Sequence, residues 1–456
     1  MALKRPAPMT APGPSGGEML RSISVIRRDP IAFLTRVRAD YGDVAQLPIP
    51  QPPTYLVTDP EAVRRVLVTN ARAYGKRTLQ YTTLSLVTGD GLLTADTESW
   101  RPARRLVQPA FHRDSLELVS RHVQDAVDRL VVRWKAVDGS VVDVDEAMMR
   151  LALEVVGESL FGSDLTGDAE RLAAATLDAL DVVIKKARMP LPVPLSVPTP
   201  SNVVLRRAVR QLDGAVDAML AERARRPLAE GEPARDMLDL LLAARADDGS
   251  SLSPQQVRDQ IVTFIVAGHE TVASALTWAW DLLARNPSAA ERLRAEADAL
   301  DSAASYEDLP RLPYTAAVMD ETLRLYPPAW VVTRRALEDD VLAGVPVAAD
   351  SLVIVSPWLV HRHASVWDDP ESFRPERFLD DAGARRRDLA TSSAYLPFGA
   401  GPRLCIGRDM ALLEGVLVLA GLARRVELEP VGASPRPVPL VTVRPDGGLP
   451  MRVRLR

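Results

Sequence analysis

The chain contains one cysteine, Cys405, within the segment Phe398-Gly-Ala-Gly-Pro-Arg-Leu-Cys-Ile-Gly407. A single thiol excludes an internal disulfide, and it excludes a zinc or iron–sulfur site built from several cysteines of this chain. A lone cysteine is often only a small buried hydrophobic residue. Here, however, glycines on both sides allow tight turns and a close approach of the backbone to a flat or bulky group. We therefore take this segment as the strongest constraint on the fold.

The surroundings of Cys405 favour an anionic sulfur. Arg403 supplies a fixed cation two residues earlier. The following residues, 406–420, carry a helical pattern, so the thiol is expected at a helix N-terminus, where the dipole and free N–H groups stabilise a thiolate.

The pattern F-x-x-G-x-R-x-C-x-G over residues 398–407 resembles the haem-binding loop of the cytochrome P-450 monooxygenases. In that family the cysteine is the axial thiolate ligand of haem iron. The resemblance implies haem b as the cofactor and Cys405 as the metal ligand. It also implies contacts with the haem group from Phe398, Gly399, Arg403, Cys405 and Gly407.

The longest uninterrupted helical pattern runs from Ser253 to Arg285, with Ser253 as N-cap and Pro254 at the first helical position. It is apolar on most faces, so its middle is expected to be buried. That middle nevertheless contains Ala267-Gly-His-Glu-Thr271. A glycine there costs about 1 kcal/mol relative to alanine, and buried polar groups are costly unless they are satisfied. The pattern indicates either a functional site or a threonine that bonds back to its own helix.

Residues 267–271 resemble the oxygen-activation motif of the same family. The resemblance implies that Ala267 and Gly268 contact the cofactor, and that the glycine opens space above the iron. It implies that Glu270 and Thr271 are catalytic and relay protons to bound O₂. His269 occupies the variable position of the motif and receives no catalytic role.

Two further segments resemble parts of the same family that bind the haem propionates. Trp100 and Arg104 are i,i+4 neighbours on a helical face, where an indole N–H and a guanidinium suit a carboxylate, although a surface cation–π pair has the same spacing. They resemble the Trp-x-x-x-Arg helix of the family, which binds one propionate. In the β-like segment 329–336, the resemblance implies that an arginine pairs with the second propionate, and the spacing favours Arg334 over Arg335.

The i,i+3 pair Glu321 and Arg324 resembles the family's buried Glu-x-x-Arg, whose third member corresponds to Arg377. We assign these three residues to folding and haem retention.

Composition places the chain among ordinary globular proteins, with 47% hydrophobic and 25% charged residues. The net charge of −4 provides no excess of positive charge for binding nucleic acid. No run of eighteen uncharged apolar residues and no signal peptide is visible, so we expect a cytoplasmic monomer without a membrane span. We expect a flexible leader over residues 1–18 and a single haem domain over 19–456.

The fold class expected is mainly α with small β-sheets, the haem lying between the long central helix and the Cys405 loop. Strands are expected over 44–57, 345–356 and 426–456, and irregular structure over 76–96. A helix is expected over 168–186, followed by an apolar, proline-rich segment over 189–200 that matches the family's loop above the substrate pocket.

The resemblance implies a monooxygenase that inserts one oxygen atom of O₂ into a lipophilic small molecule by hydroxylation or epoxidation. The electrons are expected from NAD(P)H through a separate ferredoxin and ferredoxin reductase. Two alternatives remain open: a peroxygenase driven by H₂O₂, a class that usually lacks the acid–alcohol pair present here as Glu270 and Thr271, and a haem-binding or sensor protein without catalysis, which would have little use for a proton relay. Terpenoids, steroids, fatty acids and polyketides all fit the apolar pocket segments as substrates.

Overall fold

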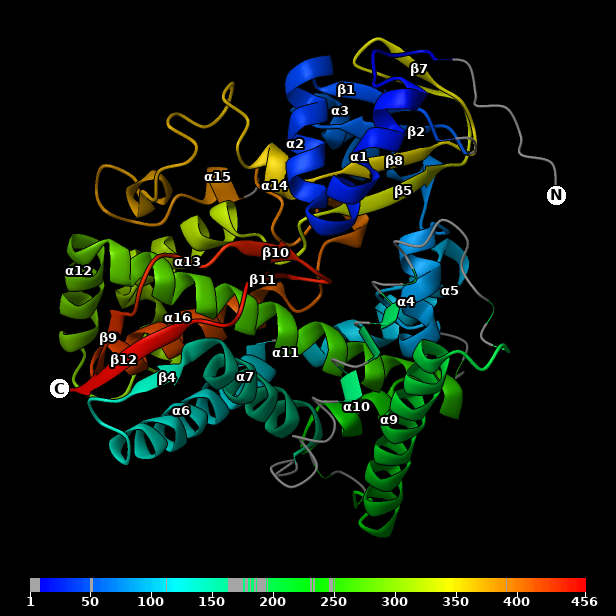
Figure 1. The fold of residues 1–456 in the computed structure, drawn as a ribbon. Coiled ribbons are helices and arrows are strands. Elements are labelled where there is room, and N and C mark those ends of the chain that lie inside the picture. The colour runs from blue at the N-terminus through cyan, green and yellow to red at the C-terminus, as the bar shows by residue number, and fades with distance from the viewer. Residues whose placement is uncertain are drawn as a thin grey trace.

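The fold was analysed in a computed structural model of the chain (Figure 1). It describes residues 9–49, 52–111, 113–162, 196–229, 234–245, 251–390 and 392–456, together with isolated residues between these ranges. Most of the expected helix over 168–186 and half of the proline-rich segment 189–200 lie outside the described residues.

Helix α11 (Pro254–Arg285) runs through the middle of the helical body (Figure 1). It begins in a capping box, because Ser253 Oγ accepts from the Gln256 N–H while the Gln256 side chain bonds the Ser253 N–H. It is packed against α7 (Val144–Phe161), α13 (Pro313–Leu325) and α16 (Arg408–Ala423). This packing explains why a helix can be apolar on most faces.

The outer helices cover this centre. They are α1 (Gly16–Arg28), α2 (Pro30–Tyr41), α3 (Pro60–Arg64), α4 (Leu79–Thr88), α5 (Thr97–Val107), α6 (Arg113–Lys135), α9 (Pro200–Arg225), α10 (Met237–Ala243), α12 (Pro287–Asp298), α14 (Pro357–Val360) and α15 (Arg387–Ala390). Short 3₁₀ or π turns stand at Arg65–Thr69, Ala71–Ala73, Gln108–Phe111, Tyr306–Arg311, Pro375–Phe378 and Gly401–Arg403.

The N-terminal lobe contains a five-stranded sheet in the order β1-β2-β8-β5-β3 (Figure 1). Its strands are β1 (Val44–Leu47), β2 (Thr54–Val57), β3 (Tyr74–Gly75), β5 (Val332–Ala336) and β8 (Leu352–Val355). β2 and β8 are parallel, and the other neighbours are antiparallel. The sheet therefore joins two segments separated by more than two hundred residues of the chain.

The remaining strands lie mostly near the C-terminus. Their bounds are β4 (Val141–Asp143), β6 (Asp340–Leu342), β7 (Val345–Val347), β9 (Val426–Pro430), β10 (Pro437–Pro439), β11 (Val443–Pro445) and β12 (Pro450–Leu455). β10 and β11 form an antiparallel hairpin. Two α11 side chains, Ser274 Oγ and Trp278 Nε1, donate to the Val443 carbonyl at 2.7 and 2.8 Å, which fixes the hairpin against the central helix.

Two local predictions differ from the structure. Residues 79–88, expected to be irregular, form α4, and its apolar face buries Tyr81, Leu84 and Val87. Four Thr or Ser residues weaken the helical pattern here, and tertiary burial overrides their low propensity. Part of the expected flexible leader is also packed: the Gln46 N–H donates to the Pro12 carbonyl at 2.9 Å, Ala11 is buried, and α1 begins at Gly16.

One helix in the described part of the chain, α11, is long and apolar enough to cross a bilayer. Of its most apolar window, 83% is buried inside the protein, which is the environment of a core helix. Its hydropathy is therefore explained by the α7, α13 and α16 neighbours.

Glu321 and Arg324 form a fully buried ion pair on α13, with Arg324 Nε 2.7 Å from Glu321 Oε2. All five N–H donors of Arg324 are used, because Nη1 donates to the His361 and Pro370 carbonyls while Nη2 donates to Glu321 Oε1 and to the Ser372 carbonyl. Arg377 Nε adds a contact of 3.3 Å with Glu321 Oε1. The predicted set of three thus forms one network, which ties α13 to the chain that leads into the Cys405 loop.

Replacing Arg324 with methionine leaves the buried Glu321 carboxylate short of its main partner. We expect Arg324→Met to lower the free energy of unfolding by about 3–5 kcal/mol, measured by urea unfolding of the haem-loaded protein with tryptophan fluorescence. The matched control is Arg335→Met, which removes an exposed pair with Asp350 at 2.6 Å and should cost less than about 1 kcal/mol. Equal losses in the two variants would contradict this assignment.

Candidate functional site: the Cys405 loop and the middle of the central helix

The Cys405 loop is fixed by its own backbone and by the N-terminal lobe. The Cys405 N–H donates to the Phe398 carbonyl at 2.9 Å, which closes the turn. Gly401 has φ of 66°, and a Cβ there would lie 2.0 Å from the Leu67 carbonyl oxygen. Only glycine permits both the positive φ and this close approach. The loop therefore sits directly on the π-helical turn Arg65–Thr69.

The Cys405 thiol faces a space inside the protein. Cys405 is exposed, and yet burial raises the pKa of its thiol, which requires protein atoms close around the sulfur. The Gly407 N–H and the Arg104 and Arg408 guanidiniums lower the same pKa. The expected stabilisation of a thiolate is thus present, but in the protein alone the burial effect is larger.

His361 holds the start of this loop. The Leu396 N–H donates to His361 Nε2 at 2.6 Å, and His361 Nδ1 lies 3.1 Å from the Arg324 carbonyl oxygen. Nε2 is therefore an unprotonated acceptor, and Nδ1 carries the proton. Burial lowers the pKa of His361 from 6.5 to about 3. No sequence pattern distinguishes His361, which connects the Glu321–Arg324 network to the loop.

The central helix presents one partly exposed face. From Asp259 to Asp281 every residue is buried except Ala267, Gly268 and Thr271. Spacings of one and four residues place these three on one side of α11. The Thr271 hydroxyl donates to the Ala267 carbonyl at 2.7 Å, so the back-bonded arrangement considered from sequence is the one observed. A Cβ at Gly268 would come within 2.9 Å of Val156, so this glycine also allows α7 to pack closely.

The Glu270 side chain points away from that face. It is buried, and its Oε1 accepts from the Thr442 hydroxyl at 3.0 Å, whereas Oε2 has no partner among the described residues. Burial raises the pKa of Glu270, while Arg444 and the Thr442 hydrogen bond lower it. The structure thus brings Thr271 and Ala267 together on one face and places the Glu270 carboxyl against the β10–β11 hairpin.

Three predicted cations and one that sequence missed gather near the Cys405 loop. The Arg403 guanidinium lies 4.1 Å from the centroid of the Trp100 ring, and the Arg104 Nη1 donates to the Leu404 carbonyl at 3.2 Å. Burial and the nearby Arg334 lower the pKa of Arg403 to about 10. Lys76 is also buried, and its pKa lies well below the usual value because of burial and the charges of Arg334 and Arg403.

None of these four cations has a carboxylate partner within the described ranges of the chain. The nearest acid acting on Lys76 and Arg403 is Asp96, which itself lies 3.4 Å from Arg77. Buried cations normally have anionic partners. The cluster is therefore suited to an anionic ligand. The position of Lys76 in this cluster could not be predicted from sequence spacing, because its neighbours Arg334 and Arg403 are far away in the chain.

Strand β5 separates the two candidate arginines. Arg334 is buried and donates to the Thr333 carbonyl at 2.9 Å, while Arg335 is directed outward to its ion pair with Asp350. Successive residues of a strand face opposite sides, so only Arg334 lies with Lys76 and Arg403.

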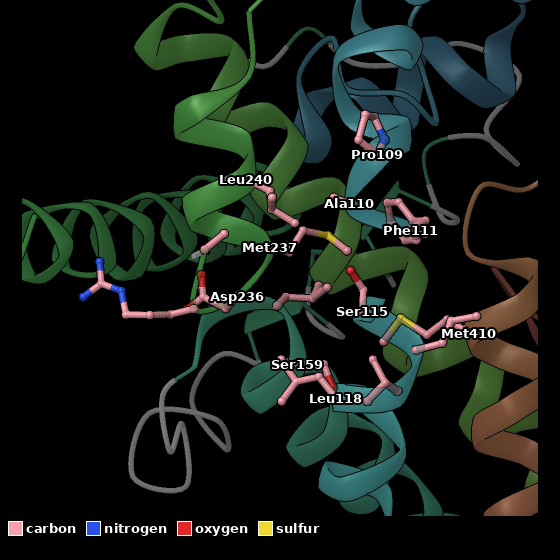
Figure 2. Close-up of a pocket in the computed structure, with 15 residues that line it drawn as sticks. Pro109, Ala110, Phe111, Ser115, Leu118, Ser159, Asp236, Met237, Leu240 and Met410 are labelled. Carbon is pink, nitrogen blue, oxygen red and sulfur yellow. The ribbon is translucent and has the colours of Figure 1, made fainter. Parts of the chain in front are cut away.

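A separate cavity of about 320 Å³ lies beside this region, between Gln108–Phe111, the start of α6, the end of α7 and the start of α10 (Figure 2). None of the predicted site residues lines it. Phe111 is in its wall, and the ring packs edge-on against Phe264 of α11 at a centroid distance of 5.6 Å.

Comparison with known proteins agrees with this geometry. A sequence model of the cytochrome P450 family matches residues 7–448. The chain belongs to the cytochrome P450 family. Among curated P450s, it is 35% identical to cyclooctatin synthase of Streptomyces melanosporofaciens over 438 residues, which cover 94% of this chain and 92% of that protein. It is 35% identical to pentalenene oxygenase of Streptomyces avermitilis over 436 residues, covering 94% and 93%.

The crystal structure of CYP175A1 from Thermus thermophillus is similar, with a TM-score of 0.78 and 32% identity, covering 96% of this chain and 98% of that one. These findings confirm the predicted P450 fold, the haem cofactor supplied with electrons from NAD(P)H through redox partners, and the activity class. The protein is a haem-thiolate monooxygenase that uses O₂ on a lipophilic small molecule.

The residues present fit haem b. The macrocycle carries two propionates, and the cluster around Arg403 offers two buried and two half-buried cations that lack carboxylate partners among the described residues. The iron needs a thiolate, and Cys405 is exposed to an internal space. Within the described ranges no group of three or more His, Cys, Asp or Glu side chains could hold a metal ion, so a single protein ligand agrees with the donors available.

The neutral state of His361 makes stability depend on pH. The folded protein resists protonation of this ring, whereas the unfolded chain accepts a proton near pH 6.5. Its contribution is complete above about pH 6.5 and is lost progressively as the pH falls toward 3.

We expect His361→Gln to be less stable than the wild type at pH 7.5. Below pH 6.5, its free energy of unfolding should fall less steeply than that of the wild type, by about 1.4 kcal/mol per pH unit. Urea unfolding at a series of pH values measures both slopes. Parallel slopes for the two proteins would show that His361 is not the titrating group.

Proposed function

We propose specific roles for the site residues of this monooxygenase. Cys405 is the axial ligand of the haem iron, and the loop residues Phe398, Gly399 and Gly407 together with Ala267 and Gly268 contact the macrocycle. Trp100, Arg104, Arg334 and Arg403 hold the propionates, and Lys76 joins them. The observation that carries this proposal is the exposed thiol next to buried and half-buried cations that have no carboxylate partner among the described residues.

Thiolate-ligated haem supplies the activation of O₂ for oxidation of C–H or C=C bonds when it is bound. The chain supplies the protons. Burial raises the pKa of Glu270, and this favours the protonated carboxyl, which is the form that can donate a proton. The Thr271 hydroxyl lies on the exposed face of α11, where it can pass a proton toward the cofactor side.

Removing the thiol tests the ligand assignment directly. Cys405→Ala should lose the Soret band that reduced, CO-bound haem shows with thiolate ligation, because no other cysteine exists in the chain. The wild type and Arg335→Met, changed at an exposed pair, should keep the band. If Cys405→Ala retained it, another residue would be the ligand.

We propose a terpenoid as the substrate. Relatives with 35% and 34% identity are named pentalenene oxygenase and cyclooctat-9-en-7-ol 5-monooxygenase. The segments of this chain expected around the pocket are mostly apolar, including the middle of α11 and residues 329–333. A cyclic hydrocarbon or its mono-alcohol matches such walls better than a charged molecule does.

A panel of cyclic terpenoid hydrocarbons and mono-alcohols should shift the ferric Soret band from low to high spin, because an apolar ligand displaces water from the site. Pentalenene is the first probe, and a saturated fatty acid of the same carbon number is the matched control. We expect at least a tenfold tighter spectral dissociation constant for the terpenoid, which corresponds to about 1.4 kcal/mol. A preference for the fatty acid would overturn this substrate class.

For its partners and cellular context we propose a ferredoxin and a ferredoxin reductase as the redox chain, a monomeric state and a cytoplasmic location. The guanidinium of Arg104 on α5 reaches the Cys405 loop. Arg101 and Arg105, on either side of Arg104 in the sequence, are exposed. They support docking of an acidic carrier near that loop. We also propose that residues 19–456 form one haem domain, with the family match over 7–448 in support.

A further inference from the structure

The β10–β11 hairpin touches the catalytic acid. Thr442 is buried in the turn between the two strands, and its hydroxyl donates to Glu270 Oε1 at 3.0 Å. The turn itself is rigidly placed, because Trp330 Nε1 donates to the Leu440 carbonyl at 3.0 Å on one side of it. On the other side, Ser274 and Trp278 of α11 hold the Val443 carbonyl.

The hairpin makes a second contact, an ion pair with the start of α7. Arg444, two residues after Thr442, pairs with Asp145 at the start of α7, with Nη2 2.5 Å from Oδ2. The Thr277 hydroxyl of α11 lies 3.1 Å from Asp145 Oδ1. As whole residues, Asp145 is 9% and Glu270 4% exposed, and Arg444 is half-buried. Both Arg444 and Asp145 act electrostatically on Glu270, so this ion pair lies near the buried carboxyl.

The direction of the Glu270 side chain indicates how the hairpin takes part in proton delivery. Its carboxyl is bonded on the hairpin side of α11, while Thr271 lies on the partly exposed face. Adjacent helical residues are about 100° apart around the axis. The carboxyl must therefore leave Thr442 before it can deliver a proton to Thr271, and its second oxygen, Oε2, has no partner among the described residues that would oppose this turn.

We propose that Thr442 is a positioning residue for proton delivery: it holds the Glu270 carboxyl beside the Arg444–Asp145 pair, where the acid is reloaded with a proton from solvent. Each turnover then requires the Thr442 hydrogen bond to break and to form again. The proton goes from water near Asp145 to Glu270, and from Glu270 to the Thr271 hydroxyl. This inference rests on the proposed roles of Glu270 and Thr271 and assigns a further role to the C-terminal hairpin.

The groups that act electrostatically on Glu270 come from two elements besides α11. Arg444 on β11 favours the ionised carboxylate, and Asp145 on α7 disfavours it. His269, the neighbour on α11, is buried and neutral near pH 7, because burial lowers its pKa to about 4, and its Nδ1 lies 2.5 Å from the Ile265 carbonyl oxygen. Thr442 donates its proton, so it stabilises the ionised form of Glu270.

The test follows the protonation of Glu270 in the haem-loaded protein without any turnover. The carboxylic C=O stretch of Glu270 is assigned in infrared pH-difference spectra as the band lost in Glu270→Gln. We expect Thr442→Val to shift the titration midpoint of that band upward by about 1 pH unit, because the carboxylate loses a donor. Thr442→Ser, which keeps the hydroxyl, should restore the wild-type midpoint.

A matched control is Thr58→Val, which removes a buried hydroxyl that donates to the Asp43 carboxylate at 2.9 Å in the N-terminal lobe. It should leave the Glu270 band unchanged. Arg444→Gln removes the positive charge and should also shift the midpoint upward. An unchanged midpoint in Thr442→Val, or a Thr442→Ser protein that behaves like the valine variant, would overturn the proposal.

A turnover measurement then separates this inference from the proposed function. With a ferredoxin, its reductase and pentalenene as the probe, we expect Thr442→Val to release several-fold more H₂O₂ per NADPH than the wild type and Thr58→Val do. Wild-type coupling in Thr442→Val would overturn the positioning role while leaving the monooxygenase assignment intact. Failure of the wild type to form product would instead count against pentalenene as substrate, and the infrared result would still decide the role of Thr442.

Discussion

The structure depends on the saturated guanidinium of Arg324. A fully buried cation is tolerable only when each of its donors has an acceptor, and those acceptors come from α13, from His361 and from the segment 370–372. The requirement fixes the chain that approaches the Cys405 loop. His361 extends this order by one further bond, to the Leu396 N–H. The position of the thiol is therefore set by a charge that takes no part in the chemistry.

Local spacing made part of the site predictable. The motif at 267–271 lies on one helix, the residues around Cys405 lie in one loop, and Arg334 and Arg335 differ by strand alternation alone. In these cases the sequence distance determines the direction of the side chain. The haem, the fold class and the reaction class came from the resemblance of these motifs to the P450 family.

The remaining contacts join residues far apart in the chain, and no periodicity reports them. Thr442 meets Glu270 across 172 residues, and Arg104 meets the Leu404 carbonyl across 300. Helix α4 was missed because its stability comes from burial of one face rather than from intrinsic propensity. Position within the fold, and not residue type, distinguishes Lys76 from the other basic residues of its segment.

The close contact between Gly401 and the Leu67 carbonyl has a consequence for recombination between related proteins. Two surfaces separated by more than three hundred residues meet there without room for one methyl group. A chimera that takes the turn Arg65–Thr69 from one parent and the loop 398–407 from another joins backbones that were never fitted to each other. Productive shuffling of this scaffold should therefore pass both segments on together, as a single inherited block.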